Sequence, residues 1–526
     1  MTPRVRGGGP GAQRLLRMLN PLEWLALAVT ILLHFTNLGT IEYFGEDEPW
    51  VEFISATFAH HLSTGSWKSA LEVLVSGWHP PVRYLVSALG VALFGPSEFG
   101  TRFFHACSGI AIFFALRRLM SPAWGRAREA TLLLYAVTGP AVLNRLNHGH
   151  GMFIALVLWA FVWLEAGEQR RSLRDLVGGL GLLVVAFFTS YEGILFYPYA
   201  CWRLWKIRRE LPLRWLVLTG GILLLPLGAV AGIFAVRGLD AKGMGLGQLT
   251  MRGGTVLTRG VVWNVPQKFE LYISAMSPFY VAMVLIAAIL AWQWMRRRIA
   301  AVPESIVRLM LFYAFHIIAW LVVFPGPMSH TLWDYPVWTA FAGWAWGIWW
   351  QRQRWVAPAF AATALAMGVL TFEGFNRIGD FTRKVNRFYA TMNVPACPSS
   401  ERWGKRALAA RLNDRFGSGE TAVTDFGSGF LIAYLRRPVR GDYQQVLADA
   451  RAGRIPTDST IKAMVLHSFG KDFESVKASF PFARTVLPAL GLDGPSFLVV
   501  WFDFPGDRVM PLEAIPATRL AADAQP

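Results

Sequence analysis

Three adjacent carboxylates, Glu46, Asp47 and Glu48, follow the first long apolar segment of this chain. Because they are neighbours, mutual repulsion and burial are expected to raise the pKa of at least one of them. A carboxylate in this state can act as a general base toward a hydroxyl or an amine. A solvated acidic loop and a cation site are the other interpretations. The flanking Tyr43 and Trp50 favour a structured site at a membrane surface, where aromatic side chains gather at headgroup level.

A second polar segment contains the turn His79-Pro80-Pro81, followed by Arg83. The two prolines restrict the backbone and end any preceding helix, so that His79 is held in a defined direction. Arg83 lies one turn further along the helix that is expected to follow. Facing the carboxylates, this cationic pair could bind a phosphate, which arginine chelates in bidentate fashion. The alternative is an ordinary helix start whose basic side chains snorkel to the membrane surface.

The composition indicates a polytopic membrane protein. The chain has 526 residues, of which 54% are hydrophobic and only 16% are charged, whereas soluble proteins average about 25% charged residues. The formal charge of +17 does not favour nucleic-acid binding, because the basic residues form short clusters between apolar runs, where topology is set. The three cysteines show no spacing typical of a disulfide or a metal site.

The basic clusters also predict the topology. Four arginines before the first span, Trp24–Leu38, place the N-terminus in the cytoplasm, and the first span is expected to be an uncleaved anchor. The short apolar segment Val82–Phe94 is predicted to lie flat in the interface, because every later basic cluster then falls inside. Residues 40–102 thus become one external loop, which we expect to be catalytic.

About eleven crossings are predicted in residues 1–372, by the criterion of roughly 20 mostly apolar residues. After the first they are Phe103–Leu116, Ala130–Leu143, Met152–Leu164, Leu176–Phe188, Ile194–Trp205, Trp215–Val236, Pro278–Trp294, Ile306–Phe324, Trp333–Trp350 and Val356–Thr371. An odd number of crossings places the C-terminus outside.

Residues 373–526 are predicted to form an extracytoplasmic α/β domain, a length within the usual domain range. Strands are expected at Thr421–Asp425, Ile461–His467 and Ser496–Asp503, and helices at Glu401–Arg415 and Tyr443–Ala452.

The motifs of the first loop together resemble the membrane glycosyltransferases of the GT-C fold, in particular the protein O-mannosyltransferases and the bacterial lipid A aminoarabinose transferases. The resemblance is carried, in order, by Asp47-Glu48, Ser63-Thr64-Gly65-Ser66-Trp67, His79-Pro80-Pro81 and Phe94-Gly95-Pro96-Ser97-Glu98-Phe99-Gly100-Thr101-Arg102. It covers roughly Ile41 to Leu119, and weaker agreement in hydropathy extends to about residue 350.

This resemblance implies transfer of a sugar, with inversion, from a polyprenyl-phosphate donor to an acceptor outside the membrane. By position, Asp47 is similar to the catalytic base of these families, and Glu48 would support or orient it. His79 and Arg102 match family positions that are candidates for the donor phosphate. Positive charge there would stabilise the leaving group as the bond breaks.

The second external loop departs from the family pattern, because residues Asn144 to Gly151 contain no acid. Here His148 and His150 could bind phosphate when protonated, contact sugar hydroxyls, or share a divalent cation with Asp47. Metal dependence therefore stays open.

Two later residues complete the predicted site. The third external turn has Glu192 where relatives tend to have a lysine, and this carboxylate could face the acceptor or the sugar; a simple turn between two spans is the alternative. His330 precedes a Pro-containing span and is a candidate for contact with the donor phosphate.

The rival hypothesis is a transporter or flippase for a lipid or polysaccharide. Transporters usually place ionisable residues at mid-bilayer on broken helices related by repeats. In this chain the acids lie at the external edge and no repeat is visible, so the enzyme is favoured. The expected location is the bacterial inner membrane. The expected partners are the bilayer, a polyprenyl-phosphate sugar donor, and a glycan, lipid or protein acceptor.

Overall fold

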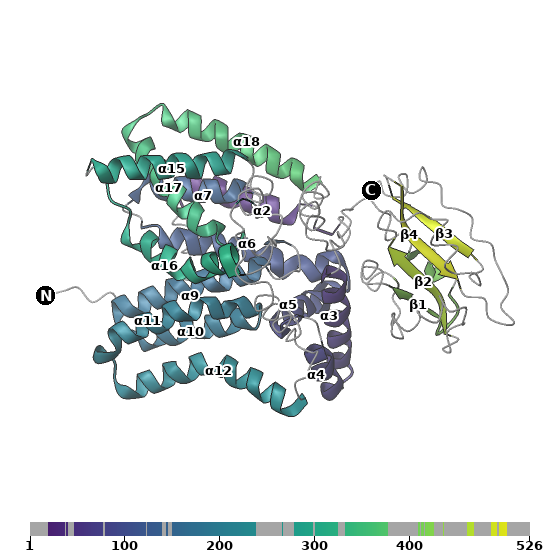
Figure 1. The fold of residues 1–526 in the computed structure, drawn as a ribbon. Helices are drawn as coiled ribbons and strands as arrows, with labels where there is room; N and C mark the ends of the chain where they lie inside the picture. Colours follow the sequence, from purple (N-terminus) through teal and green to yellow (C-terminus); the bar gives the residue numbers. More distant parts are fainter. Residues whose placement is uncertain are drawn as a thin grey trace.

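We describe a computed structural model of the chain, in which most described residues are helical (Figure 1). The structure describes residues 19–36, 38–39, 47–76, 79–121, 124–138, 144–145, 150–237, 266, 278–297, 300–323, 332–376, 409–410, 412–414, 416–424, 435, 460–467, 485–491 and 494–501.

Every predicted span overlaps a helix. These helices are α2 (Pro21–Phe35), α6 (Glu98–Leu119), α7 (Arg126–Val137), α9 (His150–Arg170), α10 (Leu173–Phe187), α11 (Tyr197–Ile207), α12 (Leu213–Arg237), α15 (Pro278–Arg296), α16 (Glu304–Ile318), α17 (Tyr335–Arg352) and α18 (Val356–Asn376). The segment predicted as the first external loop contains α3 (Asp47–Ser63), α4 (Trp67–Ser76) and α5 (Pro81–Phe94).

Two predicted spans include a segment that is helical but not α-helical. The span predicted from Ile194 begins instead with a 3-10 helix, η2 (Tyr191–Phe196), and α11 starts only at Tyr197. A proline at the second position of α11 suits a helix start, where its missing N–H costs nothing. The span predicted from Ile306 continues α16 into a π-helix, η4 (Ala319–Val323), a rare form that often marks functional sites.

Five described helices are long and apolar enough to cross a membrane: they lie in α6, α9, α12 and α15 and at Glu304–Leu321. Helices α2, α5 and α18 are apolar but offer shorter apolar stretches. These helices support an integral membrane protein, while the number of about eleven crossings stays a prediction.

The position of α5 suits the predicted flat helix. With 14 residues it is short for a crossing. Its exposed side carries Leu85, Leu89 and Leu93, spaced one turn apart, as expected of a helix with one face toward lipid. On the other side Gly90 packs so tightly on α6 that an added Cβ would lie 1.9 Å from the carbonyl oxygen of Gly100.

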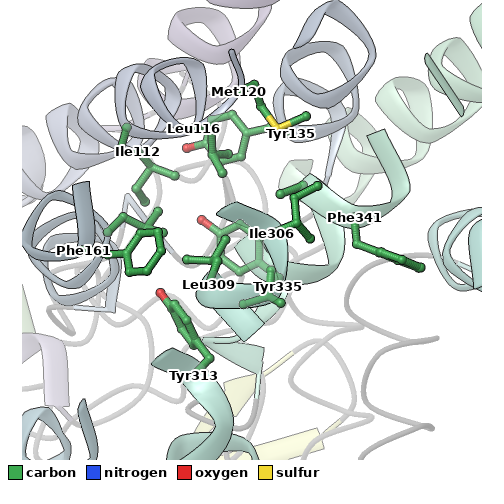
Figure 2. Packing of buried hydrophobic residues seen from close by; sticks show 14 of the residues in the cluster. Ile112, Leu116, Met120, Tyr135, Phe161, Ile306, Leu309, Tyr313, Tyr335 and Phe341 are labelled. Carbon is green, nitrogen blue, oxygen red and sulfur yellow. The ribbon is translucent and has the colours of Figure 1, made fainter. Parts of the chain in front are cut away.

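The hydrophobic core lies between the long helices. Side chains of α6, α7, α9, α16 and α17 meet in one packed region, including Ile112, Tyr135, Phe161 and Leu309 (Figure 2). Close approach of α7 and α17 depends on small residues, since a Cβ at Gly343 would lie 2.2 Å from the Thr131 hydroxyl oxygen. The core therefore holds the helices in fixed positions relative to one another.

Buried ion pairs join the helix ends that lie away from the first loop. Near the start of α2, Glu23 pairs with Arg117 at 3.2 Å and with Arg128 at 2.5 Å, which connects α2 to α6 and α7. Near the end of α9, Glu165 accepts hydrogen bonds from Tyr199 at 2.8 Å and from Arg308 at 2.6 Å. Charges in a membrane bundle are expensive unless paired in this way.

The described C-terminal residues contain a four-stranded sheet in the order β1-β2-β4-β3. Its strands are β1 (Thr421–Thr424), β2 (Ile461–His467), β3 (Thr485–Gly491) and β4 (Gly494–Trp501). The pair β1–β2 is parallel, and β4 is antiparallel to both β2 and β3. Strand β3, which contains Pro488, was not among the predicted strands; it is an edge strand, where proline is tolerated. Of the predicted helices, part of Glu401–Arg415 is helical, and Tyr443–Ala452 lies outside the described residues.

Candidate active site

Several described residues of the predicted external segments lie at helix ends that hydrogen bonds join. After α2 ends, the Leu38 carbonyl accepts a hydrogen bond from Arg102 at 3.2 Å, near the start of α6. The Thr36 carbonyl accepts one from Arg145, in the second predicted external loop, at 2.7 Å. The end of α10 joins them, because the Val82 N–H at the start of α5 donates to the Phe188 carbonyl at 3.0 Å.

An ion pair joins α3 to α6. Arg102 donates from Nε to Glu48 Oε1 at 3.0 Å and from Nη2 to Oε2 at 2.6 Å. The two side chains are 2% and 0% exposed, and a bidentate pair of this kind adds geometric specificity to its energy. The contact suits the supporting role expected of Glu48. The contact of Arg102 with a donor phosphate stays a prediction.

Asp47 is the first residue of α3. Its side chain lies outside the described part of the chain, but its backbone directly precedes the anchored Glu48. The general-base role expected of Asp47 therefore stays a prediction.

A second carboxyl group on α3 was not among the predicted site residues. Glu52 lies one turn after Glu48 and is 6% exposed. Burial, and to a smaller extent the nearby Glu98, raises the pKa of Glu52 to about 8. Glu52 is therefore mostly protonated at neutral pH. The spacing of four residues from Glu48 was the available signal, because i and i+4 share one helix face.

The His-Pro-Pro turn is held by Tyr84. The backbone N–H of His79 donates to the Tyr84 hydroxyl at 2.8 Å, and the two rings lie 6.2 Å apart. Ser55 on α3 in turn donates to the Tyr84 carbonyl at 3.1 Å. His79 and Arg83 are each 4% exposed. The turn and α3 are thus packed together, as the prediction of carboxylates near cationic groups requires.

The third predicted external turn lies beside this turn. Tyr191 is close enough to Tyr84 to interact with it electrostatically. The next residue, Glu192, accepts a hydrogen bond at Oε2 from the Trp320 indole at 3.0 Å, and His316 Nε2 lies 3.6 Å from the same oxygen. His316 and Trp320 belong to α16 and η4, and no local sequence pattern had indicated them.

The second predicted loop contributes two described side chains that the prediction had not assigned. Arg145 is 1% exposed and bonded to the Thr36 carbonyl. Asn144 donates from Nδ2 to the Tyr335 hydroxyl at 3.1 Å. The predicted His150 begins α9, and its ring lies 5.1 Å from that of Trp333. Basic and amide side chains here could bind the oxygens of a phosphate or a sugar.

Part of the predicted site lies outside the described residues: His148, His330 and the side chain of Asp47. The predicted metal set of Asp47, His148 and His150 is therefore untested and stays a prediction. Within the described residues, no group of three or more His, Cys, Asp or Glu side chains could hold a metal ion.

Two comparisons with known proteins bear on this arrangement. The profile of the dolichyl-phosphate-mannose-protein mannosyltransferase family matches residues 78–233, which include the His-Pro-Pro turn and the second and third predicted loops. A search among curated proteins gives no match.

Solved structures show the fold. ArnT from Cupriavidus metallidurans in the apo state has a TM-score of 0.58 and 15% sequence identity, covering 91% of this chain and 97% of that chain. The same protein bound to undecaprenyl phosphate has a TM-score of 0.57 and 15% identity, covering 91% and 98%. Together, the family match and the shared fold identify this chain as a membrane glycosyltransferase of the GT-C type.

Proposed function

We propose that this glycosyltransferase moves a sugar from a polyprenyl-phosphate donor to an acceptor outside the membrane, with inversion, and that Asp47 is the catalytic base. The observation that carries the proposal is the buried Glu48–Arg102 pair. It anchors the start of α3 against α6, so that Asp47 occupies a fixed backbone position close to the segment that contains the His-Pro-Pro turn.

The proposed reaction is a single displacement. Asp47 takes a proton from the acceptor hydroxyl or amine, and the acceptor atom attacks the anomeric carbon of the sugar. The bond between that carbon and the phosphate oxygen breaks, and polyprenyl phosphate leaves with the bonding electrons. Attack on the face opposite the leaving group inverts the anomeric centre.

Cationic side chains are proposed to bind the donor phosphate. His79, Arg83 and Arg145 lie on elements that meet at this end of the bundle, and charge stabilisation of a departing phosphate lowers the barrier to transfer. The structural relative that binds undecaprenyl phosphate supports a donor of this lipid class. Contacts of Arg102 and His330 with the same phosphate belong to the proposal.

The remaining assignments follow from the same proposal. Residues 1–372 would form the transmembrane enzyme and residues 373–526 an extracytoplasmic domain, with a cytoplasmic N-terminus in a bacterial inner membrane. The acceptor would be a glycan, a lipid or a protein. The family match favours this enzyme over the transporter hypothesis, because it concerns sugar transfer itself.

Replacing the proposed base tests the mechanism. Asp47→Asn should abolish sugar transfer while expression and membrane insertion stay normal. The matched control is Glu46→Gln, which removes the neighbouring carboxylate and should keep most activity. Transfer is measured in proteoliposomes supplied with undecaprenyl phosphate carrying labelled mannose, glucose or 4-amino-arabinose, with membranes of a deletion strain as acceptor. Full transfer by Asp47→Asn would exclude Asp47 from the mechanism.

A further inference from the structure

Buried polar side chains lie behind Glu192, where η2, α16 and the start of α17 meet. His316 is 0% exposed, and neither ring nitrogen has a hydrogen-bond partner among the described residues. One turn earlier on α16, the hydroxyl of Tyr313 is also buried without a hydrogen-bond partner in that part of the chain. These two side chains lie on one face of α16, because residues three apart are neighbours on a helix.

A third unpaired group comes from the second predicted loop. Asn144 donates from Nδ2 to the Tyr335 hydroxyl, but its Oδ1 has no hydrogen-bond partner among the described residues. Tyr313 is near enough to Tyr335 to interact with it electrostatically. Tyr135, Tyr313 and Tyr335 extend into the same packed region from α7, α16 and α17 (Figure 2). Asn144 and Tyr313 therefore both lie near Tyr335.

Aromatic rings line the same region. Trp333 stacks on His316 with ring centres 6.0 Å apart and an angle of 11° between the planes. The ring of Phe196 stacks on His316 at 5.7 Å. Rings next to a few polar atoms are typical of small-molecule sites, where apolar walls surround a small number of oriented hydrogen-bonding groups.

Unpaired polar atoms at this depth require an explanation. Buried polar groups in native proteins are almost always hydrogen-bonded, and an exception is explained by strain, by a catalytic role, or by a water, an ion or another molecule that binds there. Tyr313 and His316 offer a hydroxyl and two ring nitrogens, while Asn144 offers a carbonyl oxygen. A ligand that both donates and accepts hydrogen bonds through several groups fits this set, as a ring with several hydroxyls does.

We propose that Tyr313, His316 and Asn144 form the subsite for the sugar ring of the polyprenyl-phosphate donor, a pyranose or furanose. The inference rests on the proposed function. It follows from adjacency: Glu192, which contacts His316, is next to Tyr191, and Tyr191 lies near the Tyr84 that holds the His-Pro-Pro turn. A donor whose phosphate lies at that turn thereby presents its sugar to α16.

The test compares lipids with and without a sugar. Wild-type protein in nanodiscs is titrated with undecaprenyl phosphate and with the same lipid carrying mannose, glucose or 4-amino-arabinose. Wild type should bind at least one sugar-bearing lipid more tightly than the bare phosphate. Tyr313→Phe should weaken that binding about tenfold, corresponding to one hydrogen bond, and leave binding of undecaprenyl phosphate unchanged.

Measurements of thermal stability distinguish a sugar-binding role of Tyr313 from a structural role. Since the Tyr313 hydroxyl has no partner in the described protein, Tyr313→Phe should not lower the Tm of the ligand-free protein. The matched control is Tyr280→Phe, whose hydroxyl contacts the Tyr335 carbonyl at 3.1 Å and Thr339 at 3.0 Å. Tyr280→Phe should lower the Tm and leave unchanged the ratio of the affinities for the sugar-bearing lipid and for undecaprenyl phosphate. His316→Phe, which keeps a ring beside Trp333, should act as Tyr313→Phe does.

Three results would overturn the subsite. The first is that wild type binds no sugar-bearing lipid more tightly than undecaprenyl phosphate. The others are that Tyr313→Phe weakens the binding of both kinds of lipid equally, or weakens the binding of neither. Failure of the wild type to bind undecaprenyl phosphate at all would instead contradict the proposed function, so the two failures are distinguishable.

Discussion

The carboxylate of Glu48 and the guanidinium of Arg102 form a bidentate pair, although 54 residues separate them in the chain. The pair connects the first helix of the predicted catalytic loop to α6, one of the longest helices of the bundle. A buried ion pair contributes little net stability, but losing one partner leaves the other charged and desolvated. We infer that its main effect is to hold α3 in one position.

Breaking this pair should cost both stability and activity. Arg102→Gln leaves Glu48 buried without its partner, and such changes typically cost about 3–5 kcal/mol. The Tm of the purified protein should fall, and sugar transfer should be lost. The control is Arg352→Gln, an exposed arginine on α17, which should change neither.

A double substitution separates the two effects. Glu48→Gln together with Arg102→Gln removes both charges, so the Tm should recover part of the loss seen in Arg102→Gln. Activity should stay low, because neutral amides do not position α3 as the ion pair does. Additive losses of Tm in the double variant would show that the two side chains do not act as a pair.

Glu52 should make stability depend on pH. Its pKa is raised from about 4.5 to about 8 in the folded protein, mainly by burial. Between these values the unfolded state has lost the proton that the folded state keeps, so the unfolded state binds fewer protons. Stability from this group is therefore present below pH 4.5, falls as the pH rises toward 8, and is level above it.

The measurement is the Tm of the wild type and of Glu52→Gln across pH 4.5 to 9. Glu52→Gln cannot ionise, so its Tm should fall less steeply with pH, and the difference between the two proteins should level off above about pH 8. Parallel Tm curves for the two proteins would contradict a buried, protonated Glu52.

The close contact of α5 with α6 should not tolerate a methyl group. In Gly90→Ala the new Cβ would lie 1.9 Å from the Gly100 carbonyl oxygen, so the helices must separate. We expect a loss of roughly 1–3 kcal/mol, as in other overpacked cores, seen as a lower Tm and reduced transfer. Gly181→Ala is the control: it lies in α10 with no atom within 4 Å of an added Cβ, and should be neutral or slightly stabilising.

The flat position of α5 can be tested by labelling. A cysteine at the exposed position Pro96, in a chain whose three native cysteines are replaced, should react with an impermeant thiol reagent added from outside the cell. Protection from outside, together with labelling after the membrane is permeabilised, would show that Val82–Phe94 crosses the membrane and would reverse the predicted orientation of later helices.

The helices and the first-loop motif could be predicted from local patterns. An apolar run long enough to cross a bilayer must satisfy its backbone internally, so every predicted span overlaps a helix. Asp47-Glu48, the His-Pro-Pro turn and Arg102 follow one another within one continuous segment of the chain, so their order could be recognised without a structure. Strand β3, which contains Pro488, was not predicted; its edge position makes proline acceptable.

Tertiary structure decided which side chains meet. That Arg102 pairs with Glu48, and that Glu192 contacts His316 and Trp320 more than 120 residues later, depends on how the helices pack. Packing is a property of whole surfaces, so no local spacing indicates it. The sequence alone therefore determined that this chain crosses a membrane and carries a glycosyltransferase-like first loop. Only the packed bundle placed Tyr313 of α16 near Tyr335 of α17, to which Asn144 is hydrogen-bonded, because these residues are far apart in the chain.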